Sequence, residues 1–440
     1  MILYTSDMEK IIISGGSPLY GEVEIDGMKN AALPIIFATI LVRGKCQIRN
    51  LPAVSDISTS LEIIESLGAI VRRLNRHAVE IDTSGIRVRP VPSDLSRKMR
   101  ASYYLIGAEL GRFGRALVGY PGGCDFGVRP IDQHIRGFEK LGATVSVEGG
   151  YIDAKAEHGL VGTSVFFDIV TVGATLNVML AAALADGTTI IENAAREPHI
   201  VDLANFLNTC GADIKGAGTD TIKIKGVNEL HGCSYTIIPD MIEAGTYMTA
   251  VAATGGDVEI CNIIPRHMES VSAKLAEMGV TVIENDDCIR IVRDPDTPLR
   301  PCTIKTLPYP GFPTDMQPQF GALLCMASGA GTIKEGVWDN RFKYVDELKR
   351  MGASVEILGK TAVITGDPSK MFGAAVRAVD LRGGAAMIVA ALAVDGTTEI
   401  DNIRLIERGY DDIVGKFSAL GANIKKVTVN SPEDSLDAAN

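Results

Sequence analysis

The segment Gly119–Gln133, with the sequence GYPGGCDFGVRPIDQ, places Cys124 between glycines and ahead of a cation, Arg129. The glycines allow many backbone conformations, so we expect a mobile loop rather than a strand or a helix. Pro130 suits the first position of a helix, and the apolar spacing that follows predicts a helix to about Leu141. A titratable thiol beside an anion-attracting helix start is typical of a lid that closes over a negatively charged substrate. The alternative is a surface loop with an inert thiol, which is the commoner outcome for a cysteine taken alone.

Charged and polar residues also stand at the starts of other, nearly all-apolar helical segments. They are Lys29 and Asn30, Arg100, Thr171, Asp240 and Glu243, Asp315, and Arg382. If these starts are equivalent, N–H groups, cations and carboxylates converge in one cleft between two domains. With Arg129, Arg341 and Arg408, the set indicates a substrate with more than one anionic group, because arginine binds carboxylate and phosphate through two parallel hydrogen bonds. Any one of these residues alone could equally be a helix cap or a solvated residue.

An internal repeat predicts how these residues are positioned. An amphipathic helix that ends in a small-residue turn recurs six times at nearly equal intervals, with its glycine at Gly68, Gly142, Gly211, Gly279, Gly352 and Gly421. Glycine is the usual left-handed cap of a helix, and the β-branched residues after it begin strands. The other half of each unit has a short strand, a polar loop and an apolar helix such as Ala174–Ala185 or Ala385–Val394, which should be buried on every side. Two sets of three units predict two similar α/β domains.

The two domains are expected to be discontinuous in sequence. The last unit offers only one closing strand, Asn423–Val427, and the N-terminal strand Lys10–Ser14 is the simplest partner for it. The second domain would then comprise residues 1–28 and 238–428, and the first domain residues 29–237. A chain that crosses twice leaves a two-strand hinge, which suits opening and closing. Residues 429–440 are expected to form a polar tail.

The composition excludes several classes of protein. The 440 residues include 43 Lys and Arg against 54 Asp and Glu, and the formal charge of −11 argues against nucleic acid or anionic membrane as the main partner. The first residues lack the cationic and apolar parts of a signal peptide, and no apolar run is long enough to span a bilayer. The eight cysteines show no C-x-x-C pair and no zinc-ligand spacing. We therefore expect a reduced cytoplasmic protein without a metal, and we interpret every cysteine except Cys124 as structural.

Seven stretches carry the most distinctive combinations of residues. They are GMKNAALP at Gly27–Pro34, MRAS at Met99–Ser102, PGGCDFGVRPIDQH at Pro121–His134, FPTDMQPQF at Phe312–Phe320, DNRF at Asp339–Phe342, DLRGGAA at Asp380–Ala386 and ERGY at Glu407–Tyr410. Together they resemble the UDP-N-acetylglucosamine 1-carboxyvinyltransferase family of enolpyruvyl transferases, over essentially the whole chain after Met8. The resemblance implies two inside-out α/β domains, each of three βαβαββ repeats around buried helices, joined by a two-strand hinge and closing over the substrates.

The resemblance also implies a reaction. The family transfers the enolpyruvyl group of phosphoenolpyruvate to the 3-hydroxyl of UDP-N-acetylglucosamine by addition and elimination of phosphate. This is the first committed step of peptidoglycan synthesis, on which cell wall, cell shape and division depend, and it needs no cofactor and no metal. Asp315 would take the proton from the sugar hydroxyl, and Cys124 would deliver one to C3 of the enolpyruvate or form a covalent adduct with it. Cys124 would also be the target of fosfomycin, a small anionic epoxide that mimics phosphoenolpyruvate.

Substrate-binding roles follow from the same resemblance. Lys29, Arg129 and Arg408 would hold the phosphate of phosphoenolpyruvate, with Arg341 and Arg382 toward its carboxylate. The remaining substrate contacts, mostly to the UDP-sugar, would come from Asn30, Arg100, Arg129, Pro130, Ile131, Asp132, Gln133, Ile169, Val170, Thr171, Val172, Gly173, Asp315 and Val337. Asp125, Ile169 and Ser58 differ from the usual family pattern. His134 follows Gln133 in the predicted helix and is expected to serve packing rather than catalysis.

Two alternatives remain open from the sequence. An enolpyruvyl transferase that acts on shikimate 3-phosphate would share the repeat and the anion-binding cluster, but that class is not associated with a PGGC loop. A paralogue that binds a UDP-sugar without catalysis would not need Lys29, Cys124, Asp315 and Arg408, all of which are present. The oligomeric state is left open.

Overall fold

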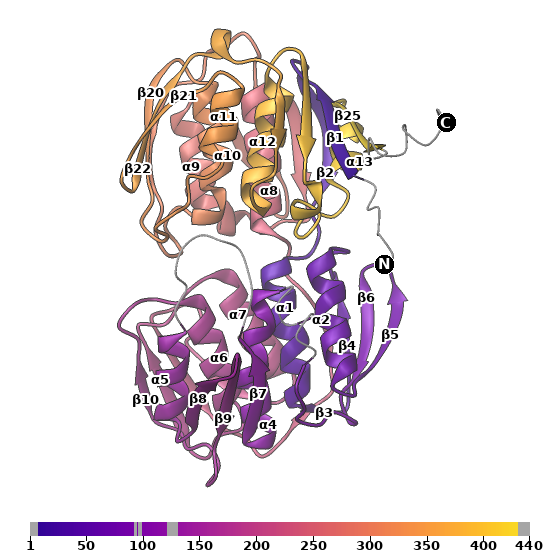
Figure 1. The fold of residues 1–440 in the computed structure, drawn as a ribbon, viewed down its shortest axis with the longest axis vertical. Helices are drawn as coiled ribbons and strands as arrows, with labels where there is room; N and C mark the ends of the chain where they lie inside the picture. Colours follow the sequence, from indigo (N-terminus) through magenta and orange to yellow (C-terminus); the bar gives the residue numbers. More distant parts are fainter. Residues whose placement is uncertain (1–7, 92–94, 96–98, 121–130, 430–440) are drawn as a thin grey trace, which may run out of the picture. The chain divides into compact units, whose positions relative to one another are not determined.

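The computed structural model describes residues 8–91, 95, 99–120 and 131–429. The chain forms two compact units, drawn in Figure 1. Unit 1 comprises Met1–Ile25, Met241–Leu307 and Gly311–Asn440, and unit 2 comprises Asp26–Asp240 together with Pro308–Pro310. Both units contain helices and sheets, which confirms the predicted α/β class.

Unit 2 is built on three helices that are buried over most of their surface. They are α1 (Lys29–Ala38), α4 (Tyr104–Phe113) and α6 (Val172–Ala182). A helix that is apolar all round is stable only when other elements cover every side, and Gly173–Ala182 of α6 is buried throughout, as expected. Amphipathic helices pack beside them: α2 (Ser55–Ser66), α5 (Asp132–Lys140) and α7 (Pro198–Thr209).

The sheets of unit 2 lie around these helices (Figure 1). One sheet has the order β15-β4-β6-β5, from Ser234–Thr236, Lys45–Arg49, Ala78–Asp82 and Ile70–Asn75. The second has the order β10-β11-β13-β12, from Ser164–Phe166, Thr188–Glu192, Thr221–Lys225 and Asp213–Lys215. A third, β7-β9-β8, contains Arg115–Gly119, Tyr151–Lys155 and Thr144–Glu148, and β14 (Leu230–His231) pairs with β3 (Val42–Arg43).

Unit 1 repeats this plan. Its buried helices are α8 (Met241–Thr254), α10 (Gln317–Cys325) and α12 (Leu381–Ala393), and its amphipathic helices are α9 (Glu269–Glu277), α11 (Val345–Arg350) and α13 (Ile413–Ala419). Burial of α12 along Arg382–Leu392 agrees with the expectation from its apolar sequence. Among the described residues, no helix of either unit is long and apolar enough to cross a membrane.

Three four-stranded sheets complete unit 1. The first, β23-β24-β1-β25, contains Ala375–Arg377, Thr397–Asp401, Met8–Ser14 and Asn423–Val429. The second, β17-β18-β16-β2, contains Thr281–Glu284, Ile289–Arg293, Gly256–Cys261 and Leu19–Glu24. The third, β19-β20-β22-β21, contains Thr303–Lys305, Gly329–Lys334, Thr361–Gly366 and Ser354–Leu358.

The four-stranded sheets share one pairing pattern. Each has a parallel pair at one edge, such as β10 with β11, and antiparallel pairs across the rest. The N-terminal strand β1 pairs with β25 in the register Ile12↔Lys425 and with β24 in the register Ile12↔Glu399. The expectation that the N-terminal strand Lys10–Ser14 pairs with the closing strand Asn423–Val427 is therefore confirmed.

One expectation about the cysteines is wrong. Cys261 and Cys288 form a disulfide, whereas the sequence predicted reduced thiols throughout. The cause is strand pairing: β16 and β18 are antiparallel neighbours in which Ile260 lies opposite Ile289, so the next residue of one strand meets the preceding residue of the other. The Cα atoms of Cys261 and Cys288 lie 4.2 Å apart. The spacing of cysteines along the sequence does not reveal a contact that is formed by strand pairing.

Candidate active site

Asp315 in unit 1 lies between two arginines. It belongs to the short 3-10 helix η4 (Thr314–Met316) that leads into α10. Its Oδ1 accepts a hydrogen bond from Nη2 of Arg341 at 2.8 Å, and its Oδ2 accepts from Nε and Nη2 of Arg382 at 3.3 and 3.2 Å. Both arginines are 4% exposed, while the side chain of Asp315 is 29% exposed. This carboxylate therefore stays accessible in a fixed orientation, next to two cations that could bind an anion.

Arg382 is held by the elements that surround it. It stands in the first turn of α12, where the N-cap residue Asp380 accepts hydrogen bonds from the backbone N–H of Arg382 and of Gly383, both at 2.9 Å. Its guanidinium carbon lies 5.6 Å from the centroid of the Tyr410 ring, within the range of a cation–π contact. The Tyr410 hydroxyl is 2.9 Å from the hydroxyl of Thr246 on α8. Buried partners from separate elements thus fix where the guanidinium points.

Glu335 organises the two segments that carry Asp315 and Val337. Its side chain is 1% exposed and accepts hydrogen bonds from the hydroxyls of Thr306 at 2.7 Å and Thr314 at 3.0 Å. It also accepts from the backbone N–H of Val337 at 2.8 Å and from that of Trp338 at 3.2 Å. One carboxylate therefore ties the residue before Asp315 to the loop that presents Val337, whose side chain is 38% exposed.

We expect Glu335→Ala to lower the free energy of unfolding by about 3 kcal/mol or more, because four donors, one of them buried and three partly buried, lose a buried charged acceptor. Glu335→Gln should lose far less, since its amide keeps the shape and one acceptor oxygen. Urea unfolding of both variants checks this, with Glu356→Ala on the exposed face of β21 as a control. Equal stability of the unchanged protein and Glu335→Ala would contradict the organising role.

Arg408 is the remaining predicted site residue of unit 1. Arg408 lies half-buried in the turn after the 3-10 helix η6 (Ile403–Leu405), and the preceding Glu407 binds Lys426 at 2.7 Å. The turn leads to Tyr410, whose ring contacts Arg382, so Arg408 and Tyr410 belong to one segment.

Lys29 of unit 2 forms a buried ion pair. It is the first residue of α1, and its Nζ lies 3.0 Å from Oδ2 of Asp56 in the first turn of α2. The two side chains are 11% and 8% exposed. The backbone N–H of Lys29 donates to Asp240 at 3.4 Å, so the helix start is also held from the other end of the unit's sequence. Asn30, the next residue, is half-buried.

A second group in unit 2 centres on Tyr103. Arg100 lies over its ring, 5.6 Å from the centroid, and the ring of His134 meets it edge-on at 5.0 Å. A Cβ on Gly173 would come within 2.7 Å of Nε2 of His134 and 2.8 Å of the Tyr103 hydroxyl, so only glycine fits at the start of α6. The structure thus brings together three segments that the sequence predicted separately: the one at Arg100, the helix after Ile131 and the loop before Gly173.

Gln133 forms further contacts between two of these segments, the start of α5 and the loop before α6. Its side-chain oxygen accepts a hydrogen bond from the backbone N–H of Asp168 at 3.3 Å, and its amide donates to Asp132 at 3.0 Å. Arg136, one turn further along α5, forms an ion pair with Asp168. These contacts join the start of α5 to the loop that contains Ile169, Val170 and Thr171, in which Ile169 is 71% exposed, while Val172 is already the first residue of α6. Ile131 itself is buried.

His134 packs as a neutral imidazole. Burial and, to a smaller extent, the nearby positive charge of Arg100 lower its pKa to about 3, against the opposite effect of Asp132. Both ring nitrogens lie among buried atoms without a hydrogen-bond partner in the described part of the chain. The geometry agrees with a packing role.

A pH dependence of stability follows from His134. Its folded-state pKa is depressed, so between pH 6.5 and about 3 the unfolded chain binds a proton that the folded chain does not. Stability is therefore highest above about pH 6.5 and falls by about 1.4 kcal/mol per pH unit below it through this group. When the pH falls from about 7.5 to 5, the free energy of unfolding of His134→Gln should decrease by about 2 kcal/mol less than that of the unchanged protein. Chemical unfolding at both pH values measures this difference. His158→Gln, at an exposed histidine, is the matched control, and identical pH profiles for all three proteins would contradict the assignment.

Some predicted site residues lie outside the described residues. They are Cys124, Arg129 and Pro130. The segment that contains them runs between β7 and α5, whose ends at Gly119 and Asp132 are described.

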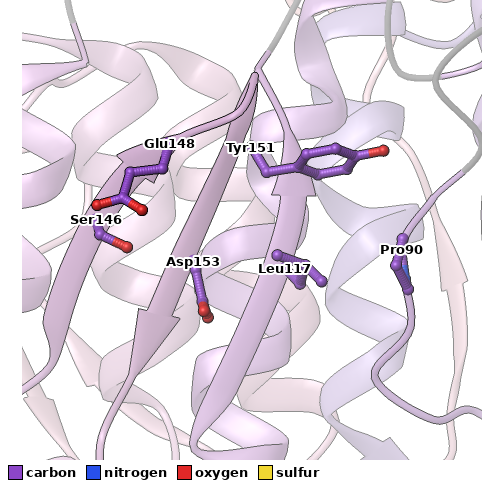
Figure 2. A pocket seen from close by; sticks show the side chains of 6 residues that line it. All are labelled: Pro90, Leu117, Ser146, Glu148, Tyr151 and Asp153. Carbon is purple, nitrogen blue, oxygen red and sulfur yellow. The ribbon is translucent and has the colours of Figure 1, made fainter.

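A hollow of about 420 Å³ lies elsewhere on unit 2, on the face of sheet β7-β9-β8 shown in Figure 2. Its lining residues are Pro90, Leu117, Ser146, Glu148, Tyr151 and Asp153. None of them belongs to the predicted site, and Asp153 is occupied by ion pairs with Lys155 at 3.0 Å and Arg115 at 3.8 Å. The two carboxylates make this hollow unsuited to an anionic substrate.

Comparison with known proteins identifies the class of enzymes that share this fold. The family described as EPSP synthase (3-phosphoshikimate 1-carboxyvinyltransferase) matches residues 13–417. The enolpyruvyl transferase NikO from Streptomyces tendae superposes with a TM-score of 0.86 at 26% identity, over 96% of this chain and all of that one. An EPSP synthase from Acinetobacter baumannii has a TM-score of 0.74 at 18% identity over the same shares, which shows a common fold. The fold is that of the carboxyvinyl, or enolpyruvyl, transferases.

Relatives with higher identity narrow the class. A UDP-N-acetylglucosamine 1-carboxyvinyltransferase from Clostridium botulinum is 53% identical over 421 residues, covering 96% of this chain and 100% of the relative. The protein named UDP-N-acetylglucosamine 1-carboxyvinyltransferase 3 from Caldanaerobacter subterraneus is 55% identical over 420 residues, with the same coverage. The chain belongs to the family of UDP-N-acetylglucosamine 1-carboxyvinyltransferases.

Proposed function

We propose that this chain is an enzyme that transfers the enolpyruvyl group of phosphoenolpyruvate to the 3-hydroxyl of UDP-N-acetylglucosamine and releases phosphate. The observation that carries the proposal is the 53% identity to a relative of that name over 96% of the chain. The reaction is the first committed step of peptidoglycan synthesis. A cytoplasmic location is part of the proposal, because both substrates are phosphorylated metabolites that do not cross membranes unaided.

The reaction proceeds by addition and elimination. The thiol of Cys124 gives a proton to C3 of phosphoenolpyruvate, which makes C2 electrophilic, and the sugar oxygen bonds to C2 while Asp315 takes the hydroxyl proton. In the elimination the Cys124 thiolate takes a proton back from C3, the bond between C2 and the phosphate oxygen breaks, and Asp315 returns its proton to the departing phosphate, so the double bond forms again and both groups are restored. The two arginines that hold Asp315 support this role, since they fix an accessible carboxylate in one orientation.

Anion binding is divided among the cationic residues. Lys29, Arg129 and Arg408 hold the phosphate of phosphoenolpyruvate, and Arg341 and Arg382 face its carboxylate. The UDP-sugar lies against Arg100, the Arg129–Gln133 segment and the Ile169–Gly173 segment, with Asn30, Asp315 and Val337 as further contacts. The packing of Arg100, Tyr103, His134 and Gly173 supports this grouping.

The domain organisation is part of the same proposal. Two inside-out domains of residues 29–237 and of residues 1–28 with 238–428, each of three βαβαββ repeats, are joined by a two-strand hinge. The shared pairing pattern of the four-stranded sheets supports the repeat. The chain passes from one compact unit to the other at Ile25–Asp26 and at Asp240–Met241, close to the two predicted crossings, and Pro308–Pro310 also group with unit 2, which adds two further crossings at that tripeptide.

We expect Lys29→Ala to raise the KM for phosphoenolpyruvate by about tenfold to a hundredfold, because a charge-assisted hydrogen bond is lost. The buried pair with Asp56 adds a second effect: removing the ammonium should also lower stability by about 3 kcal/mol, so the variant would not have an unaltered fold. Steady-state kinetics and thermal unfolding separate the two. Lys45→Ala, in the exposed pair with Glu80, is the control, and an unchanged KM for Lys29→Ala would remove Lys29 from the phosphate site.

The proposed activity is tested by phosphate release. The purified protein is incubated with phosphoenolpyruvate and either UDP-N-acetylglucosamine or shikimate 3-phosphate. We expect phosphate to be released in the incubation with UDP-N-acetylglucosamine and not in the incubation with shikimate 3-phosphate. Release with shikimate 3-phosphate alone would assign the other acceptor, and the lack of release with either would indicate a protein without this activity.

A further inference from the structure

Three cysteines from distant parts of unit 2 meet in one cluster. They are Cys46 near the start of β4, Cys210 directly after α7, and Cys233 between β14 and β15. Their sulfur atoms all lie within 4.8 Å of one another, and the Sγ atoms of Cys210 and Cys233 are 3.3 Å apart. None of the three forms a disulfide in the structure. The spacing of these residues in the sequence gave no indication of this cluster.

Backbone contacts fix the three segments against one another. The backbone N–H of Gln47 donates to the carbonyl of Cys233 at 2.8 Å, and that of His231 donates to the carbonyl of Cys210 at 2.9 Å. A Cβ on Gly232 would lie 2.2 Å from the carbonyl oxygen of Lys45. A residue with a side chain at this position would therefore prevent the close approach of the loop before Cys233 to β4. The cluster is therefore built into the fold rather than formed by mobile side chains.

We propose that Cys46, Cys210 and Cys233 bind one thiophilic d10 metal ion, of the class of zinc or cuprous ion, through their thiolates. Soft thiolate ligands select such ions, and metal–sulfur bonds of about 2.3 Å place neighbouring sulfurs about 4 Å apart, a separation this cluster already permits. Cys46 and Cys210 are 1% and 0% exposed, whereas Cys233 is half-buried, so an ion can enter past Cys233 and is then enclosed. A site with three thiolates favours a metal over a disulfide, which would use only two of them.

The site would join β4, α7 and the β14–β15 connection, and among the described residues the contacts given above for the three cysteines involve no proposed catalytic residue. Binding to the folded state alone stabilises it. The ion is therefore expected to raise the thermal stability of the protein while leaving the enolpyruvyl transfer unchanged.

Cadmium titration tests this proposal. The full chain is used in reduced form with Cys124→Ser, Cys261→Ser and Cys288→Ser, so that neither the predicted lid thiol nor the disulfide pair contributes. We expect one cadmium ion per chain, with a sulfur-to-cadmium charge-transfer absorption as strong as three thiolates give. Cys233→Ser, Cys46→Ser and Cys210→Ser should each weaken binding on the order of a hundredfold, since each thiolate carries a comparable share of the affinity.

Cys302→Ser provides the matched control, because Cys302 is a buried single cysteine of unit 1. Cadmium uptake that survives in all three cluster variants, or the lack of any stoichiometric uptake, would overturn the proposal. So would isolation of Cys210 and Cys233 as a disulfide in a protein that takes up no cadmium after reduction, which would indicate redox chemistry instead. The protein that keeps all three cluster cysteines still tests the proposal through its cadmium absorption, even if a cluster variant does not fold.

Discussion

Asp315→Asn is expected to lower kcat by about a thousandfold while the affinity for UDP-N-acetylglucosamine changes little. A general base of this kind contributes about a hundredfold to ten thousandfold to a rate, and asparagine cannot accept the hydroxyl proton. It keeps the size of aspartate, and its single carbonyl oxygen can still accept the hydrogen bonds of one of the two arginines, Arg341 or Arg382. The loss should therefore appear in turnover rather than in binding.

Steady-state kinetics and calorimetric titration of the UDP-sugar measure these two quantities. Asp339→Asn is the matched control, because Asp339 is exposed and pairs only with Lys360 among the ion pairs of the described residues, at 2.6 Å. A kcat close to that of the unchanged protein would show that Asp315 serves to position its two arginines and does not move a proton. A large loss of sugar affinity with unchanged kcat would make Asp315 a binding residue instead.

Cys124→Ser is expected to lose activity by about a hundredfold or more, whereas Cys124→Asp should retain a larger part of it. A hydroxyl is a much weaker acid than a thiol, while a carboxyl group can still deliver a proton. Both variants should resist fosfomycin, because neither has a thiolate to open the epoxide. The negative charge of Asp125 next to the thiol disfavours the thiolate, so labelling should be slower than in relatives with a neutral residue at that position.

Mass spectrometry of the fosfomycin-treated protein identifies the labelled residue. Cys302→Ser controls for the loss of a buried thiol that has no proposed role. Alkylation at a cysteine other than Cys124 would contradict the assignment. Full activity of Cys124→Ser would show that the loop has no part in proton transfer.

Local patterns in the sequence predicted the elements of the fold. The all-apolar stretches became the buried helices α6 and α12, because a helix without a polar face must be covered on every side. The unpaired strand of the last unit predicted its partner, and β1 takes that place beside β25. Such features depend on the composition and order of neighbouring residues, which a single sequence contains.

Side-chain contacts between distant segments were not predicted. Glu335 is recognised only when Thr306, Thr314 and the backbone of Val337 are seen to converge on it. The Cys261–Cys288 disulfide depends on the register of β16 with β18, which no spacing reveals. For the candidate site, the sequence indicated that Asp315, Arg341 and Arg382 serve the same chemistry, and the structure added the hydrogen bonds that join them.

The identity of the reaction product tests the central claim most directly. The protein is incubated with phosphoenolpyruvate and equal amounts of UDP-N-acetylglucosamine and shikimate 3-phosphate, and the products are analysed by mass spectrometry and NMR. The proposal predicts a single new ether, an enolpyruvyl group on the 3-oxygen of UDP-N-acetylglucosamine, with one phosphate released for each molecule formed. An enolpyruvyl ether on shikimate 3-phosphate, or phosphate released without any ether, would contradict it.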